Sequence, residues 1–279
     1  MTTVALTGAT GFIGRHVMRQ LDLRGIPFVA SGRYATPPNE LRCRWVELDL
    51  AAPPNDLYER LARPDVLIHL AWQGLPNYKA LRHFEEELPR QYAFLRELVE
   101  QGLPAVVVAG TCFEYGLQCG PLSEGMPTWP INPYGLAKDV LRRQLQMLRE
   151  TVPFELTWAR IFYVFGDGQP AGSLFSQISK AAEVGMTSFD MSGGEQLRDY
   201  RNVRDVAADL IELALLKVGV DVVNLGSGTP VSVRGLVEGW IAERGWKITL
   251  NRGYHPYPDY EPMAFWATRT KLDRVLGRE

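Results

Sequence analysis

The 279-residue sequence has no large excess of charge of either sign, because 30 basic residues face 32 acidic ones for a net charge of −2. This balance gives no reason to expect nucleic acid or an anionic membrane surface as a partner. No apolar run approaches the roughly 20 residues that a membrane-spanning helix needs. The first residues lead directly into a strand-like segment, without the basic start of a secretion signal. We therefore expect no membrane partner.

Cysteine and histidine are also scarce. The chain has three cysteines and four histidines, and none of them follows the spacing of metal ligands. Metal catalysis therefore has no support, and His69, inside an apolar segment, is interpreted as a buried core residue. An odd, small number of cysteines suits a reducing compartment, so we expect a cytoplasmic protein.

Short runs of Val, Ile, Leu and Ala alternate with segments of helical periodicity. Runs that are continuously apolar are typical of strands buried on both faces of a parallel sheet. The predicted strands are 4–7, 28–31, 45–48, 66–71, 105–109, 155–160 and 222–225, and the predicted helices are 12–23, 81–101, 134–150 and 203–218. This order predicts an α/β fold with a doubly wound parallel sheet.

Three glycines, Gly8, Gly11 and Gly14, lie between the first predicted strand and the first predicted helix. Glycine lets the backbone approach a pyrophosphate closely, and a helix N-terminus offers free N–H groups and partial positive charge. At the first strand-to-helix turn this spacing predicts a dinucleotide-binding loop, with Phe12 and Ile13 beside it.

The end of the second strand reads Val29-Ala30-Ser31-Gly32-Arg33, with no acidic residue to bind the adenosine ribose. Arg33 is available for a 2′-phosphate, so we expect NADP(H) rather than NAD(H) as the cofactor. Asp49 and Leu50, after the third strand, suit the adenine edge. Three residues after the fourth strand would flank the phosphates and ribose: Leu70, Ala71 and Trp72.

Tyr134 and Lys138 are four residues apart, which places them on one face of a helix. A phenol titrates near pH ~10, and a neighbouring ammonium favours the phenolate and lowers its pKa. The pair alone is compatible with a surface helix without function. Beside a dinucleotide loop it predicts an acid/base catalyst.

Several segments together resemble the extended short-chain dehydrogenase/reductases, the NAD-dependent epimerase/dehydratase family. The family's T-G-x-x-G-x-x-G matches Thr7 to Gly14, and its Y-x-x-x-K matches Tyr134 to Lys138. Its Ser/Thr, four residues before a Tyr-Gly, falls on Thr111. Two later segments also match, Arg198-Asp199-Tyr200 and Asn224-Leu225-Gly226-Ser227-Gly228.

The resemblance implies a Rossmann-like domain of residues 1–160 and roughly 196–225, and a substrate-binding lobe of residues 161–195 and 226–279. It implies that Tyr134 exchanges a proton with the sugar, that Lys138 binds the nicotinamide ribose, and that Thr111 bonds the reacting oxygen. It further implies that Ile161 contacts the cofactor. The substrate contacts are Phe113, Tyr163 and Arg198, with Arg198 on the diphosphate of a nucleotide sugar. The helices 81–101 and 134–150 resemble the pair that forms a homodimer in this family.

The residues after Thr111 distinguish the chemistries of the family. Dehydratases that resemble the glucose 4,6-dehydratases have Asp-Glu directly after the residue matched by Thr111. Epimerase-reductases of the GDP-fucose synthase type have an acid/base cysteine two residues after it. Cys112-Phe113 fits neither, which leaves reduction or epimerisation at C4. Because Arg33 favours an exchanging NADPH, we expect reduction of an NDP-4-keto-6-deoxyhexose, with dTDP, GDP, CDP or UDP as the nucleotide. A C4 epimerase and a non-catalytic NADP-sensing protein are the alternatives.

Overall fold

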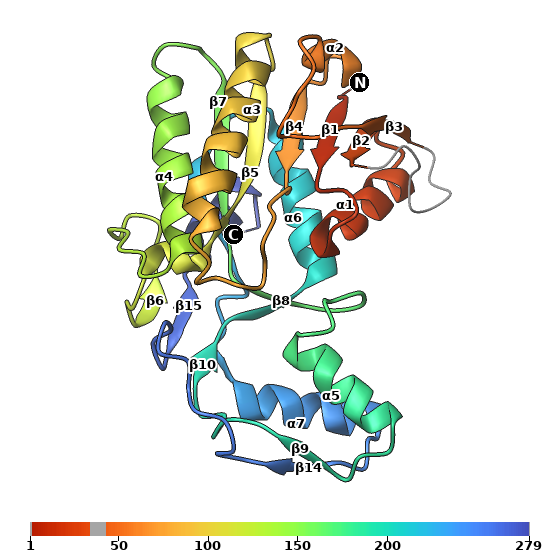
Figure 1. Cartoon of the computed structure of the whole chain (residues 1–279), viewed down its shortest axis with the longest axis vertical. Coiled ribbons are helices and arrows are strands. Elements are labelled where there is room, and N and C mark those ends of the chain that lie inside the picture. Colours follow the sequence, from red (N-terminus) through yellow and green to blue (C-terminus); the bar gives the residue numbers. More distant parts are fainter. Residues whose placement is uncertain (1, 34–42, 279) are drawn as a thin grey trace.

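The computed structural model describes residues 2–33 and 43–278. Its centre is a seven-stranded sheet of strand order β12-β7-β5-β4-β1-β2-β3, in which all neighbours are parallel (Figure 1). The strands are β1 (Val4–Thr7), β2 (Phe28–Gly32), β3 (Arg44–Glu47), β4 (Val66–His69), β5 (Ala105–Thr111), β7 (Glu155–Ile161) and β12 (Asp221–Leu225). The predicted α/β fold with a parallel sheet is confirmed.

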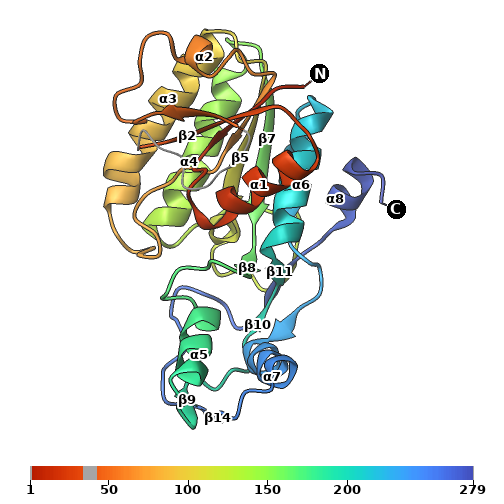
Figure 2. The same cartoon turned by 90° about the vertical axis from the view of Figure 1, so that its right-hand side faces the viewer.

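Helices cover both faces of this sheet, and each face has its own apolar core. On one face lie α1 (Phe12–Leu23) and α6 (Val203–Leu216), and their Leu21 and Leu210 are fully buried. On the other face lie α2 (Leu57–Arg60), α3 (Leu88–Glu100) and α4 (Pro133–Leu148). Figure 2 shows the two groups on opposite sides of the strands.

The segment predicted as one helix, 81–101, begins with a π-helical turn, η1 (His83–Glu87), before α3 starts at Leu88. Pro89 lies in the first turn of α3. Proline has no N–H to donate to residue 85 and its ring crowds that carbonyl, so a regular α-helix cannot run through this point. The π turn buries His83 and Glu87 completely.

A smaller lobe lies beyond the carboxyl ends of the strands (Figures 1 and 2). It contains α5 (Leu174–Glu183), α7 (Val233–Arg244) and its own core around Ile178, Val237 and Trp240. Four two-stranded pairs complete the structure: β8 (Tyr163–Phe165) with β11 (Tyr200–Asn202), β9 (Ser188–Asp190) with β14 (Thr249–Asn251), β10 (Leu197–Arg198) with β13 (Val231–Ser232), and β6 (Gly120–Leu122) with β15 (Phe265–Ala267).

One part of the predicted division into domain and lobe needs correction. The last helix, α8 (Thr270–Val275), does not lie in the smaller lobe, to which residues 226–279 were assigned. Its Leu272 is fully buried in the same core as α1 and α6. The chain therefore returns to the sheet at its end, because α8 has an apolar side that β12 and α6 cover. Within the described residues, the helices are too short or too polar to cross a membrane.

Candidate active site

Tyr134 lies in the first turn of α4, and the local sequence fixes where that helix starts. Asn132 is the N-cap, and its side-chain oxygen accepts a hydrogen bond from the Gly135 N–H at 2.8 Å. Pro133 occupies the first helical position, where its missing N–H costs nothing. A Cβ on Gly135 would lie 2.7 Å from the carbonyl oxygen of Phe113, so the helix start is pressed against that backbone.

Thr111 is the last residue of β5 and the N-cap of a short 3-10 turn, η2 (Cys112–Tyr115). Its hydroxyl accepts a hydrogen bond from the Phe113 N–H at 3.3 Å. The Thr111 side chain lies close enough to the Tyr134 phenol to act on its pKa, in the direction opposite to burial, which raises it. The structure thus brings together two of the three predicted catalytic residues at the carboxyl end of a central strand.

The environment of Tyr134 does not lower its pKa as the lysine spacing predicted. Burial raises the pKa of Tyr134 well above its ordinary value, and the nearby Tyr78 and Glu114 add to that rise. The Lys138 ammonium, which was expected to favour the phenolate, has other partners. Its Nζ donates to the carbonyl oxygen of Ala109 at 2.8 Å and lies 6.0 Å from the centroid of the Tyr134 ring.

Lys138 is itself unusual, because its side chain is buried in a largely apolar setting. The Nζ lies 3.9 Å from the ring centroid of Trp72, an arrangement that stabilises a cation over an aromatic face. Burial lowers the pKa of Lys138 to about 7, although Glu114 and Glu87 act in the opposite direction. Lys138 therefore changes its charge near neutral pH.

Aromatic rings surround Tyr134 on several sides. The ring centroids of Trp72, Tyr78, His83 and Phe113 lie between 5.3 and 6.3 Å from that of Tyr134. Both nitrogens of His83 are occupied, since Nδ1 accepts from the Trp72 indole at 3.1 Å and Nε2 donates to the Asn77 carbonyl at 2.8 Å. The His83 ring is thus held in place as a wall of the site.

The C-terminal part of the chain closes this aromatic group from the other side. Tyr260 lies 6.2 Å from Tyr78 and 6.1 Å from Phe113, between ring centroids. Beside it, Asp259 accepts a hydrogen bond from Lys79 at 2.9 Å. Phe113, predicted as a substrate contact, is therefore part of the cover over Tyr134.

Glu114 is a buried carboxylate that the sequence analysis did not single out, although it follows Thr111 at the spacing of a capping box. One oxygen accepts from the Thr111 N–H and from the Trp158 indole, both at 2.8 Å. The other accepts from Arg160 at 2.7 Å. These bonds tie η2 to β7, and they hold the backbone of Thr111 in position.

His69 is fully buried, as interpreted from the sequence, and it links the first strand to α3. Its Nδ1 is 2.8 Å from the Thr7 hydroxyl, and its Nε2 is 2.7 Å from the side-chain oxygen of Gln91. Burial lowers its pKa to about 3, so the ring is neutral. Gln91 in turn donates to Glu87 at 3.1 Å, and Glu87 accepts from the Gln73 N–H at 3.2 Å. This chain of bonds fixes the loop that follows β4.

The glycine loop fits a dinucleotide. Gly8 has φ +71°, and a Cβ there would lie 2.6 Å from the Ala71 nitrogen and 2.7 Å from the carbonyl carbon of Leu70. A Cβ on Gly14 would lie 2.1 Å from the Gly8 oxygen. Among the described residues, no side chain caps the start of α1 at Gly11. The N–H groups that open this helix, including those of Phe12 and Ile13, are therefore available to a pyrophosphate.

The other predicted cofactor residues follow the carboxyl ends of neighbouring strands. Arg33 is exposed directly after β2, Asp49 and Leu50 come soon after β3, and Ile161 ends β7. Because parallel strands end at one edge of the sheet, these positions share an edge with the glycine loop and Thr111. The Ser31 hydroxyl is used within the sheet, where it donates to the Leu6 carbonyl at 3.1 Å.

Arg198 lies on the side of the site that faces the smaller lobe. It is buried, with 2% of the residue exposed. It does not stand free for a diphosphate. Its Nε and Nη2 donate to the Glu261 carboxylate at 3.1 and 2.8 Å. Its guanidinium also lies 5.9 Å from the ring centroid of Tyr163, the third predicted substrate contact.

Comparison with known proteins agrees with this geometry. Residues 4–226 match the family described as "NAD dependent epimerase/dehydratase family". The chain belongs to this family. The match includes the glycine loop, Thr111, Tyr134, Lys138 and Arg198, so it covers the residues on which the predicted resemblance depended.

Individual relatives are similar over nearly the whole chain. A dTDP-6-deoxy-L-talose 4-dehydrogenase (NAD(+)) of Aggregatibacter actinomycetemcomitans is 32% identical over 271 residues, which are 95% of this chain and 99% of the relative. A UDP-glucose 4-epimerase of Azospirillum brasilense is 29% identical over 84% of this chain and 75% of the relative. The solved structure of MoeE5 in complex with UDP-glucose and NAD is 29% identical, has a TM-score of 0.83, and is matched over 99% of this chain and 92% of that one.

The burial of Lys138 leads to a prediction about how the stability of the protein depends on pH. Burial disfavours the charged form of Lys138 in the folded protein. The free energy that this costs is fully present below pH 7, and it is relieved as the pH rises toward about 10.4, the pKa of a lysine in the unfolded chain. Relative to Lys138→Met, the wild-type free energy of unfolding should therefore rise by a few kcal/mol between about pH 7 and pH 10. Urea denaturation at several pH values measures this difference.

The matched control is Lys180→Met, at an exposed lysine of α5. Its stability curve should run parallel to that of the wild type across the same range. A Lys138→Met curve that also runs parallel to the wild type would show that Lys138 is not desolvated.

Proposed function

We propose that this protein reduces the C4 ketone of a nucleoside-diphosphate 4-keto-6-deoxyhexose, with Tyr134 as the proton donor. The observation that carries the proposal is that Thr111, at the end of β5, and Tyr134, in the first turn of α4, lie next to each other at the carboxyl edge of the sheet. Both side chains lie where a sugar ketone would be next to a dinucleotide bound at the glycine loop.

Three polar side chains near Tyr134, those of Cys112, His83 and Glu114, do not supply a second acid/base group. Burial raises the pKa of the Cys112 thiol far above its ordinary value, so it is no thiolate base. His83 and Glu114 are occupied by the hydrogen bonds described above. Dehydration and epimerisation next to the ketone need such a group, whereas reduction at C4 needs only one proton donor.

In the reaction, the hydroxyl groups of Thr111 and Tyr134 would hold the ketone oxygen of the sugar. Nicotinamide, when bound, supplies the hydride. Tyr134 would give its proton to the oxygen as negative charge develops there, and Thr111 would stabilise that charge by its hydrogen bond. Lys138 would bind the ribose next to the nicotinamide. The aromatic cover would exclude water from the site.

The relative from Aggregatibacter actinomycetemcomitans supports this choice of chemistry. It is named a 4-dehydrogenase of dTDP-6-deoxy-L-talose. A 4-dehydrogenase and a 4-ketoreductase catalyse one step in opposite directions, and both use the same proton-exchanging group. A dTDP-sugar is therefore the first substrate to test.

Epimerisation at C4 is the second candidate, and the 29% identity with a UDP-glucose 4-epimerase favours it. A C4 epimerase would use the same Thr111 and Tyr134 but would recycle one bound cofactor. It would interconvert two sugars without net consumption of a reduced nicotinamide. A non-catalytic NADP-sensing role is less well supported, because the catalytic residues are all present. The three cysteines are unpaired, which suits a reducing compartment, and we propose a cytoplasmic location.

Tyr134→Phe tests the proton donor. Removing the phenol oxygen should lower kcat for ketone reduction by about 100-fold or more, because general acid catalysis contributes on that order. The dissociation constant for the cofactor should change less than about twofold, since the ring stays in place. Stopped assays of the nucleotide-sugar product measure the first quantity and fluorescence titration measures the second.

Tyr254→Phe is the control, because Tyr254 is 63% exposed on the smaller lobe. It should keep wild-type turnover. A Tyr134→Phe enzyme that turns over at the wild-type rate would refute the assignment of the proton donor.

The preference for NADP(H) is the part of the proposal that rests on Arg33. The relative from Aggregatibacter actinomycetemcomitans has NAD(+) in its name, and the MoeE5 structure was solved with NAD. In this chain, an exposed arginine and no carboxylate follow β2, which suits a 2′-phosphate better than a free ribose.

Arg33→Ala should weaken NADPH binding about tenfold or more, since a charge-assisted contact to phosphate is lost, and should change NADH binding less than about twofold. Fluorescence titration with both cofactors measures the two constants. Arg44→Ala, at an exposed arginine that begins β3, should affect neither. Equal weakening of both cofactors by Arg33→Ala would contradict the role of Arg33.

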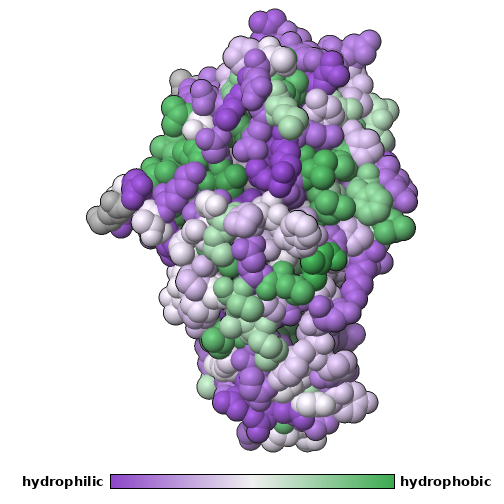
Figure 3. Space-filling view, turned by 90° about the vertical axis from the view of Figure 1, so that its left-hand side faces the viewer, coloured by the Kyte–Doolittle hydropathy of each residue, from purple (hydrophilic) through white to green (hydrophobic). Residues whose placement is uncertain are grey.

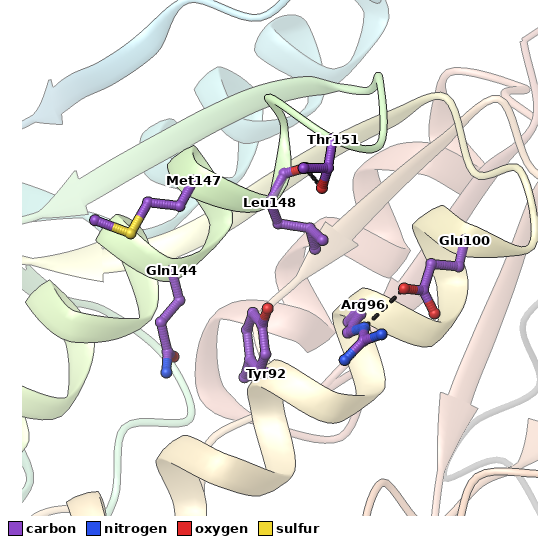
Figure 4. A pocket seen from close by; sticks show the side chains of 7 residues that line it. All are labelled: Tyr92, Arg96, Glu100, Gln144, Met147, Leu148 and Thr151. Atoms are coloured by element: carbon purple, nitrogen blue, oxygen red, sulfur yellow. Dashed lines mark hydrogen bonds and ion pairs between the residues drawn. The ribbon is translucent and has the colours of Figure 1, made fainter.

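We also propose a homodimer formed through α3 and α4. Two apolar residues of α4, Leu136 and Met147, lie on the same face of the helix and are 42% and 69% exposed. Figure 3 shows hydrophobic surface on the side of the molecule that carries α4. Close by, a hollow of about 380 Å³ lies between α3 and α4 (Figure 4), and Gln144 within it has a buried side-chain oxygen with no partner among the described residues. Exposed apolar side chains beside such a hollow suit contact with a second copy of the chain.

Met147→Glu should convert such a dimer to a monomer, because two charges would be buried at the interface. Light scattering should give twice 31.4 kDa for the wild type and 31.4 kDa for the variant. Leu23→Glu, at a 73% exposed leucine of α1 on the opposite face of the sheet, should remain dimeric. A monomeric wild type at micromolar concentration would contradict the proposal.

A further inference from the structure

Arg198 and Glu261 form a buried ion pair at the place where the substrate's diphosphate is expected. The Arg198 side chain is 3% exposed and that of Glu261 is 10% exposed. One carboxylate oxygen of Glu261 accepts from both Nε and Nη2 of the guanidinium. The pair joins β10 to the segment just before β15, which are 63 residues apart in sequence.

The remaining donors of Arg198 are also used within the protein. Nη1 donates to the carbonyl oxygens of Leu197 and Met263, at 2.9 and 3.4 Å. The flat side of the guanidinium lies 4.8 Å from the ring centroid of Phe265. An arriving diphosphate would therefore meet a neutralised arginine and a carboxylate of its own sign, and like charges at close range are costly.

The segment that carries Glu261 also covers the catalytic tyrosine. Tyr260, its immediate neighbour, packs on Tyr78 and Phe113, which both contact the Tyr134 ring. Release of Glu261 from Arg198 would therefore loosen the contact that holds Tyr260 over the site.

We propose that Glu261 takes the place of the substrate's diphosphate on Arg198, so that a nucleotide sugar binds by exchanging one anion for the other. Glu261 is then a specificity-determining residue that weakens binding of any ligand without a diphosphate to displace it. This inference rests on the proposed function, because it takes a nucleoside-diphosphate sugar as the ligand of Arg198.

Glu261→Gln tests the exchange directly. The amide is the same size and its oxygen can still accept from Arg198, but the competing charge is gone. We expect dTDP and UDP to bind about tenfold more tightly by isothermal titration calorimetry, because like-charge repulsion is removed. KM for the nucleotide sugar should fall similarly, with kcat within about twofold. Glu261→Ala should shift the affinity in the same direction.

Glu238→Gln is the matched control, because it removes the same charge from an exposed position on α7 in the same lobe. It should leave the affinities at wild-type values. Adding Arg198→Met to Glu261→Gln should abolish the gain. Unchanged or weaker nucleoside-diphosphate binding by both Glu261 variants, in a protein that still reduces its sugar, would overturn this inference alone. If none of these proteins binds any nucleoside diphosphate, both the inference and the proposed function are wrong.

Discussion

The position of the residues proposed as catalytic depends on one buried charge, the carboxylate of Glu114. It bonds the Thr111 backbone, the Trp158 indole and the Arg160 guanidinium at 2.7–2.8 Å. A charge removed from water is costly, and only a full set of partners makes up for that cost. Because those partners come from β5 and β7, Glu114 joins the two central strands just where the substrate would lie. The backbone of Thr111, which is proposed to bond the reacting oxygen, is therefore held in place by contacts of the core.

The residues around Glu114 are so closely packed that a larger residue could not replace the neighbouring glycine. A Cβ on Gly110 would lie 2.2 Å from the Trp158 indole nitrogen and 2.7 Å from a Glu114 oxygen. Only glycine leaves room for that bond at the end of β5. On the opposite side, the start of α4 is pressed against Phe113, as the contact of Gly135 shows. Thr111 and Tyr134 are thus placed by backbone contacts, which vary less than the positions of surface side chains.

The site combines a rigid half and a half contributed by the smaller lobe. The sheet and helix α4 supply the glycine loop, Thr111 and Lys138. Arg198 and Tyr260 come from segments distant in sequence, which are joined by the ion pair of Arg198 with Glu261, a hydrogen bond from Arg198 to the Met263 carbonyl and the ring contacts of Tyr260. This division suits an enzyme that must admit a large nucleotide sugar and then exclude water from its ketone.

Much of the fold could be predicted from the sequence, because buried parallel strands and amphipathic helices have strong patterns. The bounds of α1 were predicted as the structure has them, and the seven strands of the sheet were found. The two-residue strands β10 and β13 are too short to have a period, and they were missed. Helices α5 and α7 were also missed, although each starts at an N-cap serine. The side chains of Ser173 and Ser232 accept hydrogen bonds from backbone N–H groups in the first turns of these helices.

The motif residues of the site could be predicted, but their partners could not. Glu114 meets Arg160 across 46 positions, and Glu261 meets Arg198 across 63. No local pattern indicates such pairs, since only the fold brings them together. The prediction that Lys138 lowers the pKa of Tyr134 was wrong for a related reason. Spacing placed the two residues on one helix face, but burial decides the pKa of each.

The central claim is that Tyr134 and Thr111 serve a simple ketone reduction at C4. The most direct measurement is oxidation of NADPH and NADH by the purified protein with a panel of nucleoside-diphosphate 4-keto-6-deoxyhexoses, with the product's C4 configuration read by NMR. We predict stoichiometric oxidation of the cofactor and one alcohol epimer as the product. Interconversion of two nucleotide sugars without net oxidation of either cofactor would contradict this account.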